Sequence, residues 1–319
     1  MTSLASASQI LSNEPWIPTP FLPAPVLGNR LGLELWLKRE DCTPVGSFKL
    51  RGALVAMARL RDQIPDAGIW VASAGNFGLA VAVAGARHGI RVSVVVPKGA
   101  TPSKVERIRL AGADVTEHGD DFDEAKDFAR SSASRTVAAF WEDGAVHELA
   151  TGAATLAAEM LDQSGSLDCV LVPVGNGSLI KGVAGVFKDR SPDTQVVGLV
   201  ASGAPAMHQA MTGSSWNEQA NISTLADGLA VRVPITSIVK ELESVVDDVW
   251  LVEESRLLPA VRTLLDLESI LSEPSAAIAL AGLAEHRATF AGKRVAMIIT
   301  GAHLNASLMS EVIECDPLL

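Results

Sequence analysis

Lys49 has the surroundings expected of a nucleophilic amine. Residues 44–53 read Pro-Val-Gly-Ser-Phe-Lys-Leu-Arg-Gly-Ala, so the lysine follows a small turn and precedes a helix-compatible run. A lysine at such a turn can point into a cavity, where desolvation favours loss of its proton and lets the amine attack a cofactor aldehyde. The alternative is a surface lysine at the start of a helix.

A second candidate site is the run Ser73-Ala74-Gly75-Asn76-Phe77-Gly78. It follows the apolar stretch 69–72 and opens a helical stretch from about Phe77. Small residues at such a turn leave backbone N–H groups available to an anion, and the helix dipole favours negative charge there. The alternative is an ordinary strand-to-helix turn in which Asn76 caps the helix.

A third candidate is the run Val172-Pro173-Val174-Gly175-Asn176-Gly177-Ser178-Leu179, between a predicted strand and a predicted helix. Small residues allow successive N–H groups to converge on a phosphate at a helix N-terminus. Asn176 tolerates left-handed geometry, and Ser178 adds a hydroxyl donor. The alternative is a tight connection. The spacing matches neither a dinucleotide fingerprint nor a Walker loop.

Composition narrows the classes of protein. The chain has 319 residues, a net charge of −11 and no tyrosine. Without a basic stripe it is not expected to bind nucleic acid. No apolar run approaches about 18 residues, so no membrane span is predicted, and the first 20 residues do not resemble a signal peptide. Cys42, Cys169 and Cys315 lack metal spacing and suit reduced thiols in a cytoplasm.

Apolar runs alternate with alanine-rich helical runs, which predicts a parallel sheet covered on both faces. The expected strands are 69–72, 91–96, 113–117, 169–172, 195–199, 248–252 and 295–300. The expected helices include 77–87, 102–111 (capped by Thr101, with Pro102 at its first position) and 121–130. The first 20 residues, rich in serine and proline, are predicted to be an extended arm.

The three motifs, in this order, resemble the fold-type II pyridoxal-phosphate enzymes, and the wording of residues 38–53 is closest to the threonine/serine dehydratase and serine racemase branch. The resemblance extends from about Trp16 to about Ala306. It implies an α/β fold of two parallel-sheet domains with pyridoxal 5'-phosphate in the cleft between them. Residues 1–65 and 146–319 would form the large domain and residues 66–145 a small inserted domain. It also implies a cytoplasmic homodimer that takes a small-molecule amino acid.

The resemblance assigns a part to each motif. Lys49 would carry the cofactor beside Phe48, and Asn76 would bond its phenolic oxygen. The substrate carboxylate would bind the turn made by Ser73, Ala74, Gly75, Asn76 and Phe77. The phosphate would bind Gly175, Asn176, Gly177, Ser178 and Leu179.

Two further positions are implied near the ring. Thr300, in Ala-Met-Ile-Ile-Thr-Gly-Ala-His, would bond the pyridine nitrogen, although a threonine ending a strand is more often structural. Glu273, in Glu-Pro-Ser-Ala-Ala, is a secondary candidate whose alternative is a helix N-terminal glutamate before proline. Relatives that bind a divalent cation have carboxylates where Val200 and Ala206 stand here, so no metal site is expected.

The reaction type follows from two of these positions. Serine racemases have a serine at the position of Ala74 that supplies a second base, and alanine has no proton to move. A neutral hydroxyl at Thr300 keeps the ring a modest electron sink, which favours prompt loss of a β-group. We therefore expect β-elimination from serine, threonine or a related amino acid, giving 2-oxo acid and ammonium. The alternatives are a β-replacing or threonine-synthase-like enzyme, a racemase, or a non-catalytic amino-acid sensor.

Overall fold

The computed structural model describes the backbone of residues 2–319 and the side chains of residues 4–319. The chain divides into two compact units. The first unit comprises residues 1–17 and 49–152, and the second comprises residues 18–48 and 153–319. The boundaries expected from the sequence near residues 66 and 145 stay a prediction.

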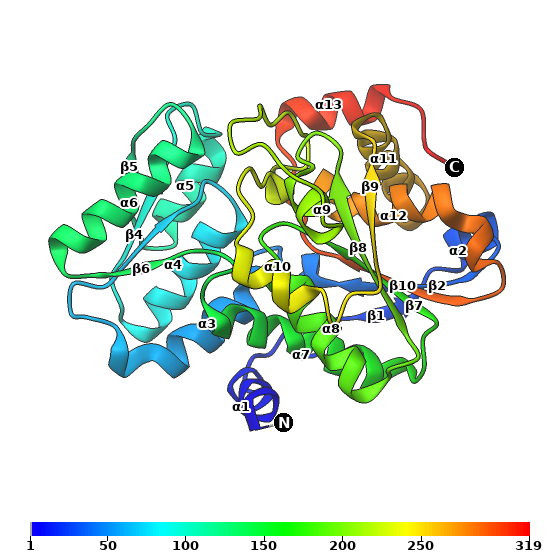
Figure 1. Ribbon diagram of the computed structural model, residues 1–319, viewed down its shortest axis with the longest axis horizontal. Helices are drawn as coiled ribbons and strands as arrows, with labels where there is room; N and C mark the ends of the chain where they lie inside the picture. Colours follow the sequence, from blue (N-terminus) through cyan, green and yellow to red (C-terminus); the bar gives the residue numbers. More distant parts are fainter. Residues whose placement is uncertain (1) are drawn as a thin grey trace. The chain divides into compact units, whose positions relative to one another are not determined.

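The first unit is built on a four-stranded parallel sheet of order β5-β4-β3-β6 (Figure 1). Its strands are β3 (Ile69–Ala72), β4 (Val92–Val96), β5 (Asp114–Glu117) and β6 (Ala139–Trp141). Its helices are α1 (Thr2–Leu11), α3 (Lys49–Leu60), α4 (Asn76–His88), α5 (Pro102–Leu110) and α6 (Phe122–Thr136). Every residue of β4 is buried, as expected for a central strand covered on both faces.

The second unit holds a six-stranded sheet of order β1-β2-β10-β7-β8-β9, in which only β1 is antiparallel to its neighbour. Its strands are β1 (Phe21–Pro23), β2 (Glu34–Arg39), β7 (Cys169–Pro173), β8 (Gln195–Ala201), β9 (Asp248–Val252) and β10 (Arg294–Ile299). Its helices are α2 (Pro25–Leu31), α8 (Ser178–Arg190), α9 (Ala206–Met211), α10 (Thr236–Leu242), α11 (Leu257–Glu268), α12 (Pro274–His286) and α13 (Ala306–Glu314). Helix α7 (His147–Ser164) begins in the first unit and ends in the second.

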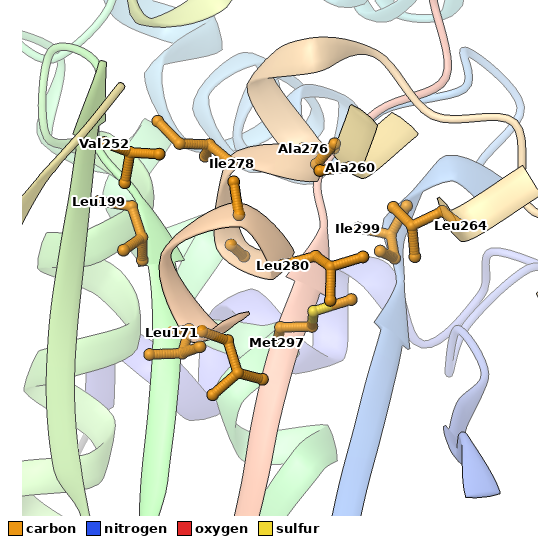
Figure 2. Packing of buried hydrophobic residues seen from close by; sticks show 14 of the residues in the cluster. Leu171, Leu199, Val252, Ala260, Leu264, Ala276, Ile278, Leu280, Met297 and Ile299 are labelled. Carbon is orange, nitrogen blue, oxygen red and sulfur yellow. The ribbon is translucent and has the colours of Figure 1, made fainter. Parts of the chain in front are cut away.

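The core of the second unit lies between its sheet and α12. Figure 2 shows Met297 of β10 beside Leu280 of α12 and Leu199 of β8 close to Val252 of β9; Leu171 of β7 belongs to the same cluster, and all these side chains are buried. Burying a leucine-sized side chain contributes about 1.5–3 kcal/mol, so this interface holds the strands whose ends carry the candidate site.

The strands predicted from the sequence are confirmed to within two residues at each end. The predicted helix 121–130 continues to Thr136 and ends where Val137 adopts φ 54°. Three strands were not predicted, namely β1, β2 and β6. They are short or partly polar, and tertiary pairing rather than local pattern defines them.

The expected extended arm at the N-terminus is wrong, because residues 2–11 form α1. Ala7 and Leu11 are buried and lie four residues apart, on one helical face. That face packs on α3 of the same unit. Ser6 and Ser8 are exposed, so the abundance of serine did not prevent a helix.

Over the part of the chain that the structure describes, no helix combines the length and the apolar character needed to cross a membrane. Cys42, Cys169 and Cys315 are all free thiols.

Candidate active site

Lys49 is the first residue of α3, and the turn before it is firmly anchored. The Thr43 hydroxyl donates to the Ser47 carbonyl oxygen at 2.7 Å and accepts from the Ser47 N–H at 2.9 Å. Gly46 adopts φ 68°, the left-handed conformation that favours glycine. These contacts hold the conformation of the turn that precedes α3.

The turn also pairs with the end of β10. Phe48 N–H donates to the Thr300 carbonyl oxygen at 3.1 Å, and Ala302 N–H donates to the Gly46 carbonyl oxygen at the same distance. Ser47 and Gly301 form an isolated antiparallel bridge between these bonds. Thr300 is 4% exposed. The structure therefore places Thr300 beside Phe48, the residue next to Lys49 in the chain.

The Lys49 amine contacts an acid that sequence reasoning missed. Its Nζ lies 2.5 Å from Oδ2 of Asp143, with the two side chains 16% and 18% exposed. Asp143 follows β6, at the carboxyl end of a parallel strand, which is where ligand-binding residues collect in such sheets. The strand was not predicted, so this signal was not available.

The turn of residues 73–77 and Asp143 lie at the same edge of the four-stranded sheet. Strands β3 and β6 are paired in parallel, with Val71 opposite Trp141, so Ser73 and Asp143 both lie two residues beyond that pair. The Lys49 amine reaches this edge through its contact with Asp143. The first unit thus gathers Lys49, Asp143 and the 73–77 turn.

The capping alternative for Asn76 is not what the structure shows. Gly75 is the N-cap residue, and Asn76 is the first residue of α4. The first turn of a helix leaves N–H groups without an acceptor inside the helix, and the first helical bond here runs from Leu79 N–H to the Gly75 carbonyl oxygen. A Cβ on Gly78 would lie 2.6 Å from the Ser73 carbonyl oxygen. Glycine is therefore needed at position 78 for the turn to close against Ser73, and a helix N-terminus of this kind favours an anion.

The loop of residues 175–179 connects β7 to α8 in the second unit. Gly177 is the N-cap residue of α8 at φ 91°, and its carbonyl oxygen accepts from Lys181 N–H. The N–H groups before Lys181 in the first turn have no acceptor within the helix and can face an anion. Asn176 would tolerate left-handed geometry but does not adopt a positive φ, whereas Gly177 does. Ser178 and Leu179 are both buried.

Glycine is required twice in this loop. A Cβ on Gly175 would lie 2.7 Å from the Gly228 carbonyl oxygen, and one on Gly177 would lie 2.6 Å from Cγ2 of Ile238. The N–H of Gly228 in turn donates to the Ser275 hydroxyl at 3.1 Å. The loop therefore packs closely against the segment around Gly228, and a hydrogen bond connects that segment to the N-terminus of α12.

Glu273 precedes α12 and lies against the end of β10. Its N–H donates to the Gly301 carbonyl oxygen at 3.1 Å, and its Oε2 accepts from His303 N–H at 3.3 Å. A Cβ on Gly301 would lie 2.7 Å from Oε1 of Glu273. The second unit thus connects the 175–179 loop, Glu273, Thr300 and Phe48 through successive contacts.

The positions where some relatives have metal-binding carboxylates are apolar here. Val200 is 0% exposed in β8, and Ala206 is 7% exposed at the start of α9. Across residues 4–319, no three His, Cys, Asp or Glu side chains come together in an arrangement that could hold a metal ion.

Comparisons with known proteins identify the family of this chain. A family model described as pyridoxal-phosphate dependent enzyme matches residues 13–301. The biosynthetic L-threonine dehydratase of Haemophilus influenzae is 33% identical over 298 residues, which cover 93% of this chain and 58% of that protein. The L-threonine ammonia-lyase of Thermotoga maritima is 31% identical over 288 residues, covering 90% of this chain and 72% of that protein.

A solved structure extends the likeness to three dimensions. The processed form of threonine deaminase isoform 2 from Solanum lycopersicum superimposes with a TM-score of 0.89 at 30% identity. The match covers 98% of this chain and 88% of that one. Against the Haemophilus dehydratase, however, the chain spans just under three fifths of the relative's length.

The residues present fit the group that the family binds. The 175–179 loop offers helix N-terminal N–H groups and two glycines that no larger residue can replace, as a phosphate requires. Lys49 offers an amine for the aldehyde, and Thr300 a buried neutral hydroxyl for a ring nitrogen.

Proposed function

The chain belongs to the family of pyridoxal-phosphate-dependent enzymes, and from this premise we propose that it removes the β-hydroxyl of an amino acid such as serine or threonine, giving a 2-oxo acid and ammonium. The names of its relatives, threonine dehydratase and threonine ammonia-lyase, support this reaction. The observation that carries it is the buried Thr300 hydroxyl at the end of β10, next to Phe48. A neutral partner leaves the ring nitrogen unprotonated more readily than a carboxylate would.

Each motif has a part in the proposed reaction. When bound, pyridoxal phosphate supplies an electron sink for the pair left on the α-carbon. Lys49 binds the cofactor and then takes the α-proton at Nζ. The 73–77 turn holds the substrate carboxylate, and Asn76 orients the ring. The 175–179 loop holds the phosphate, with Glu273 as a secondary contact near the ring.

Ala74 argues for elimination over racemisation. Racemisation needs a proton carrier on each face of the α-carbon, and Lys49 serves one face. The methyl group of Ala74 carries no transferable proton. We therefore propose that formation of the D-isomer is at most a minor side reaction.

We further propose that the enzyme is a cytoplasmic homodimer, as the family resemblance implies. Three free cysteines suit a reducing compartment. Light scattering after size-exclusion chromatography measures the assembly directly, and a mass of one chain would contradict the dimer.

The test is a product analysis with L-serine and L-threonine. We expect 2-oxo acid and ammonium in equal amounts, and loss of both the visible absorbance and turnover in Lys49→Ala. The matched control is Lys98→Ala, which removes a lysine that is 66% exposed in the same unit.

The outcomes separate the alternatives. Oxo acid that forms only when a second nucleophile is absent would indicate a β-replacing enzyme. A yellow, active Lys49→Ala protein would refute the assignment of the lysine. Absence of product with every hydroxy amino acid, despite bound cofactor, would favour the sensor.

A further inference from the structure

We propose that Asp143 is a positioning residue for the amine of Lys49, which it orients when the amine is not bonded to the cofactor and whose ammonium form it stabilises once the amine has taken a proton. The inference rests on the proposed function of Lys49. Nζ of Lys49 and Oδ2 of Asp143 are 2.5 Å apart, and each side chain is less than one fifth exposed. Charge-assisted bonds of this kind are about twice as strong as neutral ones, and partial burial limits screening by salt.

Both partners sit on rigid supports within the first unit. Lys49 begins α3, and close backbone contacts tie that helix to the start of α7. A Cβ on Gly52 would lie 2.7 Å from the Leu149 carbonyl oxygen, and one on Gly152 would lie 2.5 Å from Cα of Gly52. The lysine backbone therefore has little room to move relative to the residues that follow Asp143.

Contacts of the neighbouring residues Glu142 and Gly144 also hold the loop that carries Asp143. Gly144 adopts φ 95°, and the Glu142 carbonyl oxygen accepts from Ala145 N–H at 3.1 Å. The Glu142 side chain is engaged elsewhere, 3.5 Å from Nζ of Lys126 and 3.3 Å from Nη2 of Arg130. Two adjacent carboxylates thus have separate partners, and Asp143 is the one directed at Lys49.

The pairing has a chemical use in the proposed reaction. When the lysine takes the α-proton, the C–H bond breaks, an N–H bond forms at Nζ, and the electron pair stays with the substrate. The amine becomes an ammonium, whose charge the carboxylate stabilises. The same contact fixes where the amine points while the substrate occupies the cofactor. Such positioning acts on turnover more than on substrate binding.

The first experiment uses the cofactor-free protein, so its readout does not depend on activity. A brief pulse of acetic anhydride labels neutral amines, and mass spectrometry of the peptide containing Lys49 gives its rate relative to Lys98. In Asp143→Asn we expect labelling of Lys49 to rise about fivefold, the upper end for an ion pair near the surface. The matched control Glu142→Gln removes an equal charge one residue away and should stay within about twofold. Equal rates in wild type and both variants would overturn the proposal.

The second experiment uses the holoenzyme. Asp143→Asn should lower kcat by about 10- to 100-fold with KM changed less than about threefold, and should enlarge the isotope effect of an α-deuterated substrate. Asp143→Glu keeps the charge and should recover part of kcat, which also guards against a folding defect in the asparagine variant. A KM effect without a kcat effect would refute positioning. If Lys49→Ala stayed active the proposed function would fail, whereas the labelling result would still report on the pair.

Discussion

Replacing Gly177 in the proposed phosphate loop by alanine is the sharpest test of the site. The added methyl group would disfavour the left-handed backbone of this residue and would also collide with neighbouring side chains. Gly177 is the N-cap residue of α8, with φ 91° and ψ −6°. An added Cβ would lie 2.6 Å from Cγ2 of Ile238 and 3.5 Å from Cδ1 of Leu242. Gly177→Ala therefore meets both a backbone penalty and a steric one.

The expected magnitude is the sum of these two costs. Left-handed backbone costs a non-glycine residue roughly 1–2 kcal/mol. Forcing a methyl group against packed side chains costs about 1–3 kcal/mol more. The total, about 2–5 kcal/mol, lowers the free energy of unfolding if the loop keeps its shape. If the loop relaxes, it weakens cofactor binding instead, and 2 kcal/mol corresponds to about 30-fold in Kd.

Two measurements on one preparation distinguish these outcomes. Urea titration of the cofactor-free protein gives the free energy of unfolding, and spectral titration with pyridoxal phosphate gives Kd. The matched control is Gly185→Ala in the same helix, where an added Cβ meets nothing within 4 Å and the site is exposed. That change should stabilise the protein by up to about 1 kcal/mol. The reasoning is refuted if Gly177→Ala matches wild type in both measurements.

Three further expectations follow from the same structure. Activity should survive EDTA, because Val200 and Ala206 cannot ligate a cation; a loss restored by magnesium or calcium would contradict this. Ala74→Ser should raise D-isomer formation from a low level, because it supplies a hydroxyl near the second face; chiral chromatography showing D-serine forming as fast as oxo acid in the unmodified enzyme would overturn the elimination hypothesis. Lys38→Met should lower the free energy of unfolding by about 3–5 kcal/mol, since Lys38 is fully buried with its Nζ 2.6 Å from Glu159; urea titration showing a loss under about 1 kcal/mol would contradict that estimate.

The fold was predictable wherever strands are continuous apolar runs. Strands β3, β7 and β9 lie within one residue of their expected bounds, because burial on both faces leaves a strong local pattern. Strand β2 was missed because it carries buried and exposed residues together, including the buried Lys38. Its identity depends on parallel pairing with β10, which no local pattern records.

The site was predictable to the extent that it consists of short local motifs. The turns at residues 46–49, 73–77 and 175–179 each combine small residues with a helix start, and the helices begin within these motifs, at Lys49, Asn76 and Ser178. Asp143 was not predictable in this way, because its partner is 94 residues away in the chain. Such a contact arises from sheet order, which places β6 beside β3.

The geometry of the 175–179 loop, the proposed phosphate site, determines which of its residues must be glycine. Residues 175–178 read Gly-Asn-Gly-Ser, so glycine stands at two of the four positions. The structure needs glycine only at Gly175, where a side chain would strike the Gly228 carbonyl oxygen, and at Gly177, where φ is 91°. Asn176 has no positive φ, and Ser178 is the first residue of a helix, where a hydroxyl is well tolerated. Asn176 and Ser178 therefore stand at the two positions of the loop that can accept a side chain, so the proposed phosphate site needs two glycines rather than four.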